Sequence, residues 1–268
     1  MLGITGTGGA GKSSLTDELI RRFNLELEHL KIAIIAIDPT KRKTGGALLG
    51  DRIRMNAINH PNIYFRSIAT RDTKGEVPDA LPNIINACKV AEFDLIIVET
   101  PGIGQGDAGI VPYVNTSMYV MTPEFGAASQ LEKIDMLDFA DLVVINKFDR
   151  KGSEDAHRDV RKQYQRNHEL FTTPVDDLPV YGTIASKFND DGVTALYQGV
   201  LSTFAAKQLN CWEGDFFEKI NSKQSTTRTS IIAAERQRYL AEIAETVRDY
   251  HANVKQQVVL ARERQQLI

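Results

Sequence analysis

One eight-residue motif constrains this chain more than any other feature. Residues Gly6–Ser13 read GTGGAGKS and match G-x-x-x-x-G-K-[ST], the pattern of the phosphate-binding P-loop. The apolar run Leu2–Ile4 precedes the motif as an expected strand, and the amphipathic run Ser14–Phe23 follows it as an expected helix. Glycines let backbone N–H groups turn towards phosphate oxygens, and the start of the helix adds partial positive charge. The motif in this setting predicts that the chain binds a nucleoside triphosphate.

The P-loop pattern also assigns roles to individual side chains. Lys12 is expected to reach the β- and γ-phosphates, and the Ser13 hydroxyl is expected to bind Mg²⁺. The backbone of the loop and of the first helical turn should hold the phosphates. The nucleotide-binding candidates here are Gly8, Gly9, Ala10, Gly11, Lys12, Ser13 and Ser14.

Composition is typical of a globular protein with a full hydrophobic core. Of the 268 residues, 42% are hydrophobic and 25% are charged, and the formal net charge is −3. This charge gives no indication of binding to nucleic acid or to an anionic membrane. The sequence shows neither a signal peptide nor an apolar run of about 18 residues, so we expect a cytoplasmic protein. Cys88 and Cys211 are isolated and are expected to be buried thiols.

Short apolar, β-branched runs alternate with helical stretches. The expected strands are Ile32–Ile37, Leu95–Val98 and Leu142–Ile145, with weaker candidates at Ile63–Phe65, Met118–Met121 and Val180–Tyr181. The helices expected between them cover residues 78–91, 127–139, 153–167 and 193–207. This alternation predicts an α/β fold with a doubly wound, mostly parallel sheet, which binds its ligands at the carboxyl ends of the strands.

The two ends of the chain differ from its middle. The first expected strand begins almost at Met1, which suggests a domain taken from a longer polypeptide. Residues 229–266 are polar with apolar residues at helical spacing, which predicts one or two long helices. We therefore expect a P-loop domain over residues 1–208 and a helical extension or linker over residues 209–268. The extension either closes the domain as a solvated helix or packs against a second subunit or a neighbouring domain.

A second motif indicates which base the site recognises. Residues Asn146–Asp149 read NKFD, follow an expected strand and fit the N-K-x-D element of GTPases. The Asp149 carboxylate can accept hydrogen bonds from guanine N1–H and the 2-amino group together, whereas adenine offers no such pair. The run Ala185–Lys187 resembles the third base-contacting loop of G proteins. Guanine is thus the predicted base, and the candidates that contact it are Asn146, Lys147, Phe148, Asp149, Ser186 and Lys187.

Two carboxylates end expected strands. Asp38 follows one buried run and Glu99 follows another, so both should face the phosphates at the carboxyl edge of the sheet. Together with Ser13, phosphate oxygens and water, they supply the hard oxygen ligands that Mg²⁺ prefers. Residues Glu99–Gly102 stand where many GTPases have D-x-x-G. Gly102 and the glycine-rich residues 103–106 therefore form a candidate switch.

These segments together resemble a known family. Asp38–Thr40, Thr44–Met55 and Glu99–Gln105 are similar to the MeaB/ArgK-type G-protein chaperones of adenosylcobalamin-dependent acyl-CoA mutases. Among these, the chain most resembles the GTPase domain embedded in fused isobutyryl-CoA mutases. The specific part is G-G-x-L-L-G-D-R-x-R-M, because P-loops and N-K-x-D motifs occur in many GTPases. The resemblance implies a SIMIBI-like P-loop GTPase fold and GTP hydrolysis that gates cobalamin loading, release or protection in a mutase.

The resemblance also implies roles for further residues. Asp51 would join Asp38 around Mg²⁺, Arg54 would contact phosphate, and Lys133, within a switch at Thr122–Leu137, would neutralise transition-state charge. The implied metal site consists of Ser13, the main-chain oxygen of Ile37, Asp38, Asp51, Glu99 and Thr100. The implied catalytic residues are Lys12, Asp51, Arg54, Glu99 and Lys133.

Cofactors and partners follow from the same resemblance. Mg²⁺ with GTP or GDP would bind this chain, whereas adenosylcobalamin would be reached only through the partner mutase. The mutase domains would lie on the same polypeptide, making the full-length fusion an isomerase as well, and a homodimer is expected. The chain itself has no D-x-H-x-x-G cobalamin-binding signature. Gln105 is the candidate for orienting water, and slow intrinsic turnover is expected.

Other classes of function stay open. A P-loop small-molecule kinase would need an arginine-rich lid, and only Lys41, Arg42 and Lys43 offer basic residues of that kind. A nickel-delivery chaperone would need paired Cys or His residues. The histidines are instead scattered at positions His29, His60, His157, His168 and His251. A purely regulatory module would bind nucleotide with little turnover.

Overall fold

The computed structural model describes residues 1–39, 55–70, 77–102, 108–210, 212, 214, 216–226 and 239–267. The strands are β1 (Leu2–Gly6), β2 (Ile32–Asp38), β3 (Ile63–Ala69), β4 (Leu95–Glu99), β5 (Thr116–Met121), β6 (Leu142–Asn146) and β7 (Val180–Thr183). The helices are α1 (Lys12–Glu26), α3 (Leu81–Val90), α4 (Ala128–Leu131), α5 (Ser153–Asn167), α6 (Asp191–Ala206) and α7 (Tyr239–Gln266). Short 3₁₀ turns lie at Ala108–Tyr113, Pro123–Phe125, Asp135–Asp138 and Val175–Asp177.

The strands form one seven-stranded sheet in the order β3-β2-β4-β1-β5-β6-β7, and every neighbouring pair is parallel. The predicted doubly wound parallel α/β fold is therefore confirmed. Central β1 separates the half built from β2 to β4 from the half built from β5 to β7. The residues that follow β1 consequently lie where the winding reverses, which is the usual ligand crevice of such sheets.

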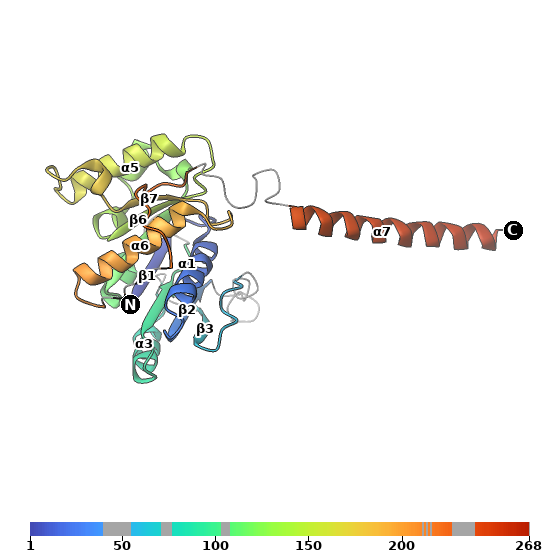
Figure 1. The fold of residues 1–268 in the computed structure, drawn as a ribbon, viewed down its shortest axis with the longest axis horizontal. Helices are drawn as coiled ribbons and strands as arrows, with labels where there is room; N and C mark the ends of the chain where they lie inside the picture. The colour runs from blue at the N-terminus through green and yellow to red at the C-terminus, as the bar shows by residue number, and fades with distance from the viewer. Residues whose placement is uncertain are drawn as a thin grey trace. The chain divides into compact units, whose positions relative to one another are not determined.

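Helices cover both faces of the sheet (Figure 1). On one face α1 and α6 pack on each other and on the strands, with Phe23 and Tyr197 among the fully buried side chains. On the other face α3 covers the β2–β4 half and α5 covers the β5–β7 half. Burial of apolar side chains on both faces explains why the central strands read as continuous hydrophobic runs in the sequence.

Most predicted elements occur where expected, and α5 coincides with the helix predicted at residues 153–167. The continuous helix predicted at residues 127–139 is wrong. The chain forms the single-turn helix α4 and the 3₁₀ turn Asp135–Asp138 there, separated by Ile134, which has a non-helical ψ of 88°. Residues 127–139 contain neither glycine nor proline, so nothing in the local sequence marks this break. Met136 and Leu137 in the 3₁₀ turn are both fully buried.

The chain divides into two separate compact units, Met1–Thr226 and Thr227–Ile268. The first unit continues past residue 208 because Trp212, Phe217 and Ile220 pack against the α1–α6 core. In the second unit the predicted helical extension is confirmed as α7 over Tyr239–Gln266, while residues 227–238 lie outside the described residues. The domain boundary itself stays a prediction. No described helix has the length and hydrophobicity required to cross a membrane.

A buried histidine supports the edge of the sheet that carries β6 and β7. His157 on α5 is only 3% exposed, and its Nε2 lies 3.1 Å from the carbonyl oxygen of Val180. Its ring meets the Phe148 ring edge to face, with 5.6 Å between centroids. Burial, aided by the positive charge of Arg161, lowers the pKa of His157 to about 4. The imidazole is therefore neutral in the folded protein at neutral pH.

Acidification should destabilise the fold through His157. Because the folded pKa lies below the unfolded value of about 6.5, the unfolded chain binds the proton first. The contribution of His157 to stability is complete above about pH 6.5 and falls as the pH drops towards 4, by about 3 kcal/mol for this group. Urea unfolding of the wild type and of His157→Gln at about pH 7.5 and about pH 4.5 measures this loss. Equal losses in the two proteins would contradict the prediction.

Candidate functional site

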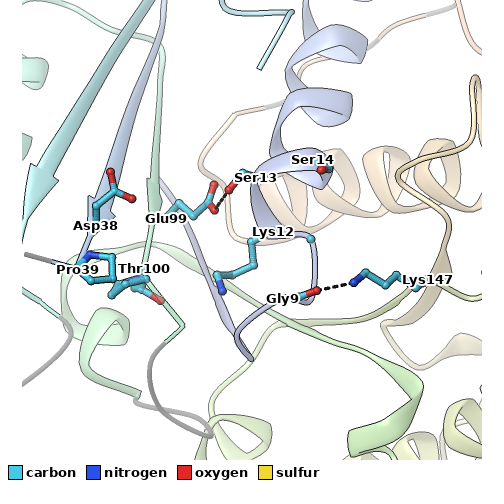
Figure 2. Close-up of a pocket in the computed structure, with 11 residues that line it drawn as sticks. Gly9, Lys12, Ser13, Ser14, Asp38, Pro39, Glu99, Thr100 and Lys147 are labelled. Carbon is cyan, nitrogen blue, oxygen red and sulfur yellow. Dashed lines mark hydrogen bonds between the residues drawn. The ribbon is translucent and has the colours of Figure 1, made fainter. Parts of the chain in front are cut away.

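The predicted P-loop connects β1 to α1. Lys12 is the first residue of α1 and only 7% exposed, and its Nζ donates to the carbonyl oxygens of Gly6 at 3.1 Å and Thr7 at 3.2 Å. The loop thus holds the ammonium group across its own opening (Figure 2). A buried ammonium with carbonyl partners is costly to displace except by a stronger anionic ligand such as a phosphate.

Two glycines bring other loops against the P-loop. Gly11 precedes α1 with a φ of 86°, and a Cβ there would lie 2.6 Å from Nδ2 of Asn146. Gly102, after β4, has a φ of 66°, and a Cβ there would overlap Nζ of Lys12. Both positions combine left-handed backbone with close approach, so side chains are excluded there. Gly102, the predicted switch residue, thus lies directly beside Lys12.

The predicted metal-ligating residues lie at the carboxyl edge of the sheet. Glu99 ends β4 and is 4% exposed; Oε1 accepts from the Ser13 hydroxyl at 2.7 Å. Its other oxygen accepts from the Thr16 hydroxyl at 3.0 Å. Sequence reasoning missed Thr16, although its position four residues after Lys12 places it on the same helix face. Glu99 therefore connects β4 to two hydroxyls of α1.

The second carboxylate lies at the end of the neighbouring strand. Asp38 ends β2, is 4% exposed, and accepts a hydrogen bond from the hydroxyl of Ser67 on β3. Nothing in the sequence indicated Ser67, because the contact arises only from the pairing of β2 with β3. Thr100 donates through its hydroxyl to the Thr5 hydroxyl oxygen at 2.8 Å.

These side chains line one pocket of about 370 Å³ at the P-loop (Figure 2). Its described lining consists of Gly9, Gly11, Lys12, Ser13, Ser14, Asp38, Pro39, Glu99, Thr100, Pro101 and Lys147. Two buried carboxylates and a hydroxyl on one wall are hard oxygen donors, and they fit Mg²⁺. Within the described ranges, no group of three or more His, Cys, Asp and Glu residues is arranged to hold a metal ion. Asp51, the expected third carboxylate, lies outside those ranges.

The N-K-x-D residues join the P-loop to the loop after β7. Asn146 is 2% exposed; Nδ2 donates to the carbonyl oxygen of Ala10 at 2.7 Å. Its Oδ1 accepts from the Thr183 hydroxyl and from the backbone N–H of Ala185, both at 3.1 Å. Lys147 donates from Nζ to the Gly9 carbonyl oxygen at 2.6 Å. One buried amide thus holds three loops of the predicted nucleotide site together.

The remaining predicted residues are placed as follows. Asp149 and Ser186 are exposed near the carboxyl ends of β6 and β7, and the Phe148 ring packs on Gly182. Gly8 is exposed, and Ile37 is buried within β2. Lys133 is exposed in the turn after α4 and is not among the described residues lining the pocket. Arg54, Gln105 and Lys41–Lys43 lie outside the described residues.

Comparison with known proteins identifies the family to which this arrangement belongs. The family model described as "Methylmalonyl Co-A mutase-associated GTPase MeaB" matches residues 1–267. The chain belongs to the MeaB family of GTPases. This membership confirms the resemblance inferred from the sequence motifs and the expectation that the chain is a GTPase.

Curated relatives are much longer than this chain. The fused isobutyryl-CoA mutase of Cupriavidus metallidurans is 65% identical over 268 residues, which is 100% of this chain and 24% of the relative. The fused isobutyryl-CoA mutase of Geobacillus kaustophilus is 58% identical over 262 residues, covering 98% of this chain and 24% of the relative. The chain thus spans about a quarter of these relatives.

Among solved structures, HypB from Helicobacter pylori in complex with nickel has a similar fold. The TM-score is 0.54 at 15% identity, covering 81% of this chain and 90% of HypB. At this identity the similarity concerns the fold alone, and it agrees with the parallel sheet and P-loop described above.

Replacing Glu99 with glutamine should remove most of the GTPase activity. The glutamine amide keeps one oxygen that can accept from a hydroxyl of α1, but the pocket wall loses one of its two carboxylate charges, leaving that of Asp38. We expect kcat for Mg²⁺-dependent GTP hydrolysis to fall about 100-fold, because the pocket would hold Mg²⁺ less well. Phosphate release measures this effect. Glu154→Gln, the same change at an exposed position on α5, is the control, and a kcat within about threefold of wild type in Glu99→Gln would contradict the prediction.

Proposed function

We propose that this GTPase selects guanine through Asp149 and uses its GTP cycle to gate adenosylcobalamin loading and release in an acyl-CoA mutase. The mutase is proposed to be isobutyryl-CoA mutase-like and to lie on the same polypeptide. The contact between the base loops and the P-loop is the observation that carries the guanine part of this proposal. Asn146 and Lys147 donate to the carbonyl oxygens of Ala10 and Gly9, so a purine and its phosphates would be held as one ligand.

The phosphate end of the site supports this proposal through its charges. Lys12 lies between P-loop carbonyls and can turn to phosphate oxygens, while Gly9 and Gly11 of the P-loop and Ser13 and Ser14 at the start of α1 line the same pocket. Ser13, Asp38 and Glu99 would hold Mg²⁺, with Asp51, Thr100 and the Ile37 carbonyl as further proposed ligands. Bound Mg²⁺ supplies positive charge that offsets the charge developing on the phosphates. Arg54 and Lys133 are proposed to add positive charge beside the γ-phosphate.

The base end of the site supports guanine. Asp149 lies beyond the end of β6 with its carboxylate exposed, at the end of the loop that Asn146 anchors. Two parallel hydrogen bonds from guanine to a carboxylate are charge-assisted, and adenine cannot supply them. Phe148, Ser186 and Lys187 are proposed to complete the base site, with Phe148 fixing the loop on Gly182.

The mutase part of the proposal rests on the organisation of the relatives. Both fused isobutyryl-CoA mutases carry a segment that matches essentially this whole chain within a protein about four times as long. A GTPase segment on the same polypeptide as a mutase supports the proposal that it acts on the mutase's cofactor. Cytoplasmic location and a homodimer through the helical extension are further proposals.

Asp149→Ala should abolish the preference for guanine. Calorimetry with GDP and ADP in the presence of Mg²⁺ measures both affinities. We expect wild type to bind GDP at least about 100-fold more tightly than ADP, and the variant to bind both weakly and equally, because a site built for specific hydrogen bonds rejects ligands lacking them. Asp155→Ala, at an exposed aspartate on α5, should keep the preference. An Asp149→Ala protein that still discriminates would overturn the assignment.

The partner is tested by single-turnover GTP hydrolysis. We expect the rate to rise about tenfold or more when an isobutyryl-CoA mutase lacking its own GTPase segment is added, because residues that order the switches would come from the partner. An equal amount of albumin is the control. An unchanged rate, together with unchanged retention of adenosylcobalamin by the mutase, would argue against a mutase partner.

A further inference from the structure

A short segment near the end of the first compact unit, residues Ser222–Thr226, lies along the edge of the sheet. Gln224 forms a parallel bridge with Gly182 of β7. The Gly182 N–H donates to the Lys223 carbonyl oxygen at 2.9 Å, and the Ser225 N–H donates to the Gly182 carbonyl oxygen at 2.8 Å. We call residues 222–226 the docking segment. It covers backbone groups that β7 would otherwise leave unpaired at the sheet edge.

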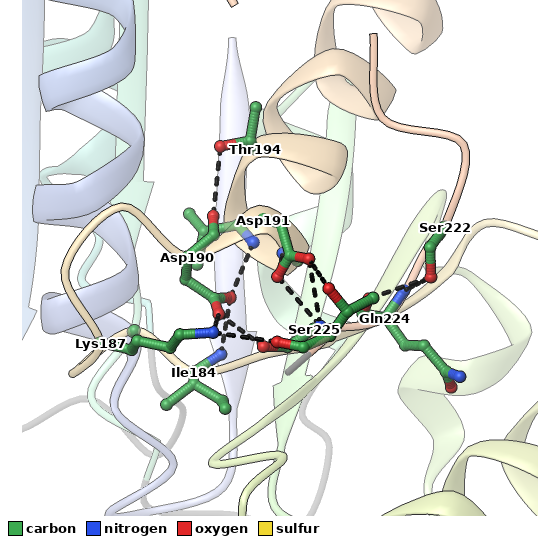
Figure 3. A network of polar contacts seen from close by, with 12 residues as sticks. Ile184, Lys187, Asp190, Asp191, Thr194, Ser222, Gln224 and Ser225 are labelled. Carbon is green, nitrogen blue, oxygen red and sulfur yellow. Dashed lines mark hydrogen bonds and ion pairs between the residues drawn. The ribbon is translucent and has the colours of Figure 1, made fainter. Parts of the chain in front are cut away.

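Two adjacent aspartates hold this segment in place (Figure 3). Asp190, which precedes α6 and is fully buried, accepts from the Ser225 hydroxyl at 2.5 Å. Asp191 accepts from the backbone N–H of Thr226 at 3.0 Å and from the hydroxyl of the same residue. The docking segment is therefore fixed by charge-assisted hydrogen bonds as well as by backbone pairing.

Asp190 also holds the loop that follows β7, residues 184–187, here called the purine loop. Its Oδ2 accepts from the backbone N–H of Ile184 and of Val193, both at 3.0 Å. Lys187, at the end of the purine loop, lies 3.6 Å from Oδ1 of Asp190 and donates to the Thr226 carbonyl oxygen at 3.0 Å. One carboxylate thus joins both ends of the purine loop to the docking segment.

The same network reaches the P-loop helix. Arg22 on α1 is 2% exposed and donates to the Asp190 carbonyl oxygen at 3.0 Å, to the Thr194 hydroxyl at 3.1 Å and to Glu18 at 2.7 Å. Arg22 therefore fixes the backbone at Asp190 against α1. With the Asp190 backbone held in place, a shift of the purine loop can reach the docking segment through the Asp190 side chain, and the reverse also holds.

We propose that the docking segment is a specificity-determining element and that Ser225 is a positioning residue for guanine binding. Docking of Ser222–Thr226 holds the purine loop in the conformation that receives the base, and the base in turn strengthens docking. This inference rests on the proposed guanine site. Thermodynamic linkage requires that docking increase the affinity for the base by the same factor by which the bound base favours docking.

The test compares a ligand that has a base with one that has none. Inorganic tripolyphosphate with Mg²⁺ reports on the P-loop alone, whereas GDP with Mg²⁺ also engages the purine loop. In the full chain, Ser225→Ala should raise the Kd for GDP about fivefold or more and change the Kd for tripolyphosphate by less than about twofold. Ser202→Ala is the matched control, because it removes the same hydroxyl from an exposed position on α6, where it donates to the Gln198 carbonyl oxygen.

A second measurement uses the wild-type chain and needs no variant. Hydrogen exchange followed by mass spectrometry reports on the amides of residues 223–226, two of which donate to Gly182 and Asp191. GDP should slow their exchange about fivefold or more, while tripolyphosphate should leave it unchanged.

The outcomes separate this inference from the proposed function. A GDP affinity that Ser225→Ala leaves within about twofold of wild type, or equal losses for GDP and tripolyphosphate, would overturn the positioning role. Exchange in residues 223–226 that does not respond to GDP would do the same. Equal affinity of the wild type for GDP and ADP would instead overturn the proposed function, and this inference with it.

Discussion

The buried amide of Asn146 is the interaction on which the rest of the site depends. Its nitrogen donates to the Ala10 carbonyl oxygen of the P-loop, and its oxygen accepts from Thr183, the last residue of β7, and from Ala185 in the loop that follows. An amide with donor and acceptor on one planar group can join a carbonyl to N–H and hydroxyl donors at once, which no carboxylate or ammonium group can do. Because Asn146 is buried, each of these bonds is costly to leave unmade. Asn146 therefore joins the predicted phosphate loop to both predicted base loops through buried hydrogen bonds.

The parallel sheet explains why charged groups gather beside that amide. Asp38, Glu99 and Asn146 each end a buried strand, and parallel strands present all their carboxyl ends at one edge. The carboxylates are nearly inaccessible to solvent, and the hydroxyls of Ser13, Thr16 and Ser67 that donate to them offset part of the cost of burying their charge. Such a wall of oxygen donors facing Lys12 suits a magnesium-bound polyphosphate.

A second buried polar residue, Asp190, plays a similar part at the β7 edge of the sheet. Asp190 joins the purine loop to the docking segment by accepting hydrogen bonds from both. Asn146 likewise joins the P-loop to the base loops through the hydrogen bonds of its side chain. Both residues are buried, polar and located at the end of a strand or before a helix. We propose that, through Asp190, nucleotide binding affects a chain segment that does not contact the nucleotide.

The sequence alone determined the parallel α/β fold, the P-loop with its strand and helix, and the strand-end positions of Asp38 and Glu99. These follow from local patterns, because hydrophobic periodicity and glycine spacing act over a few residues. The break at Ile134 was not predicted, because residues 127–139 contain no glycine or proline to mark it. Helical spacing from Lys12 could have identified Thr16 as a site residue. No local pattern could have identified Ser67, Arg22 or Asp190. Only the tertiary structure decided their partners, because a polar side chain's partner comes from whichever strand or helix packs beside it, and that neighbour can lie far away in the chain.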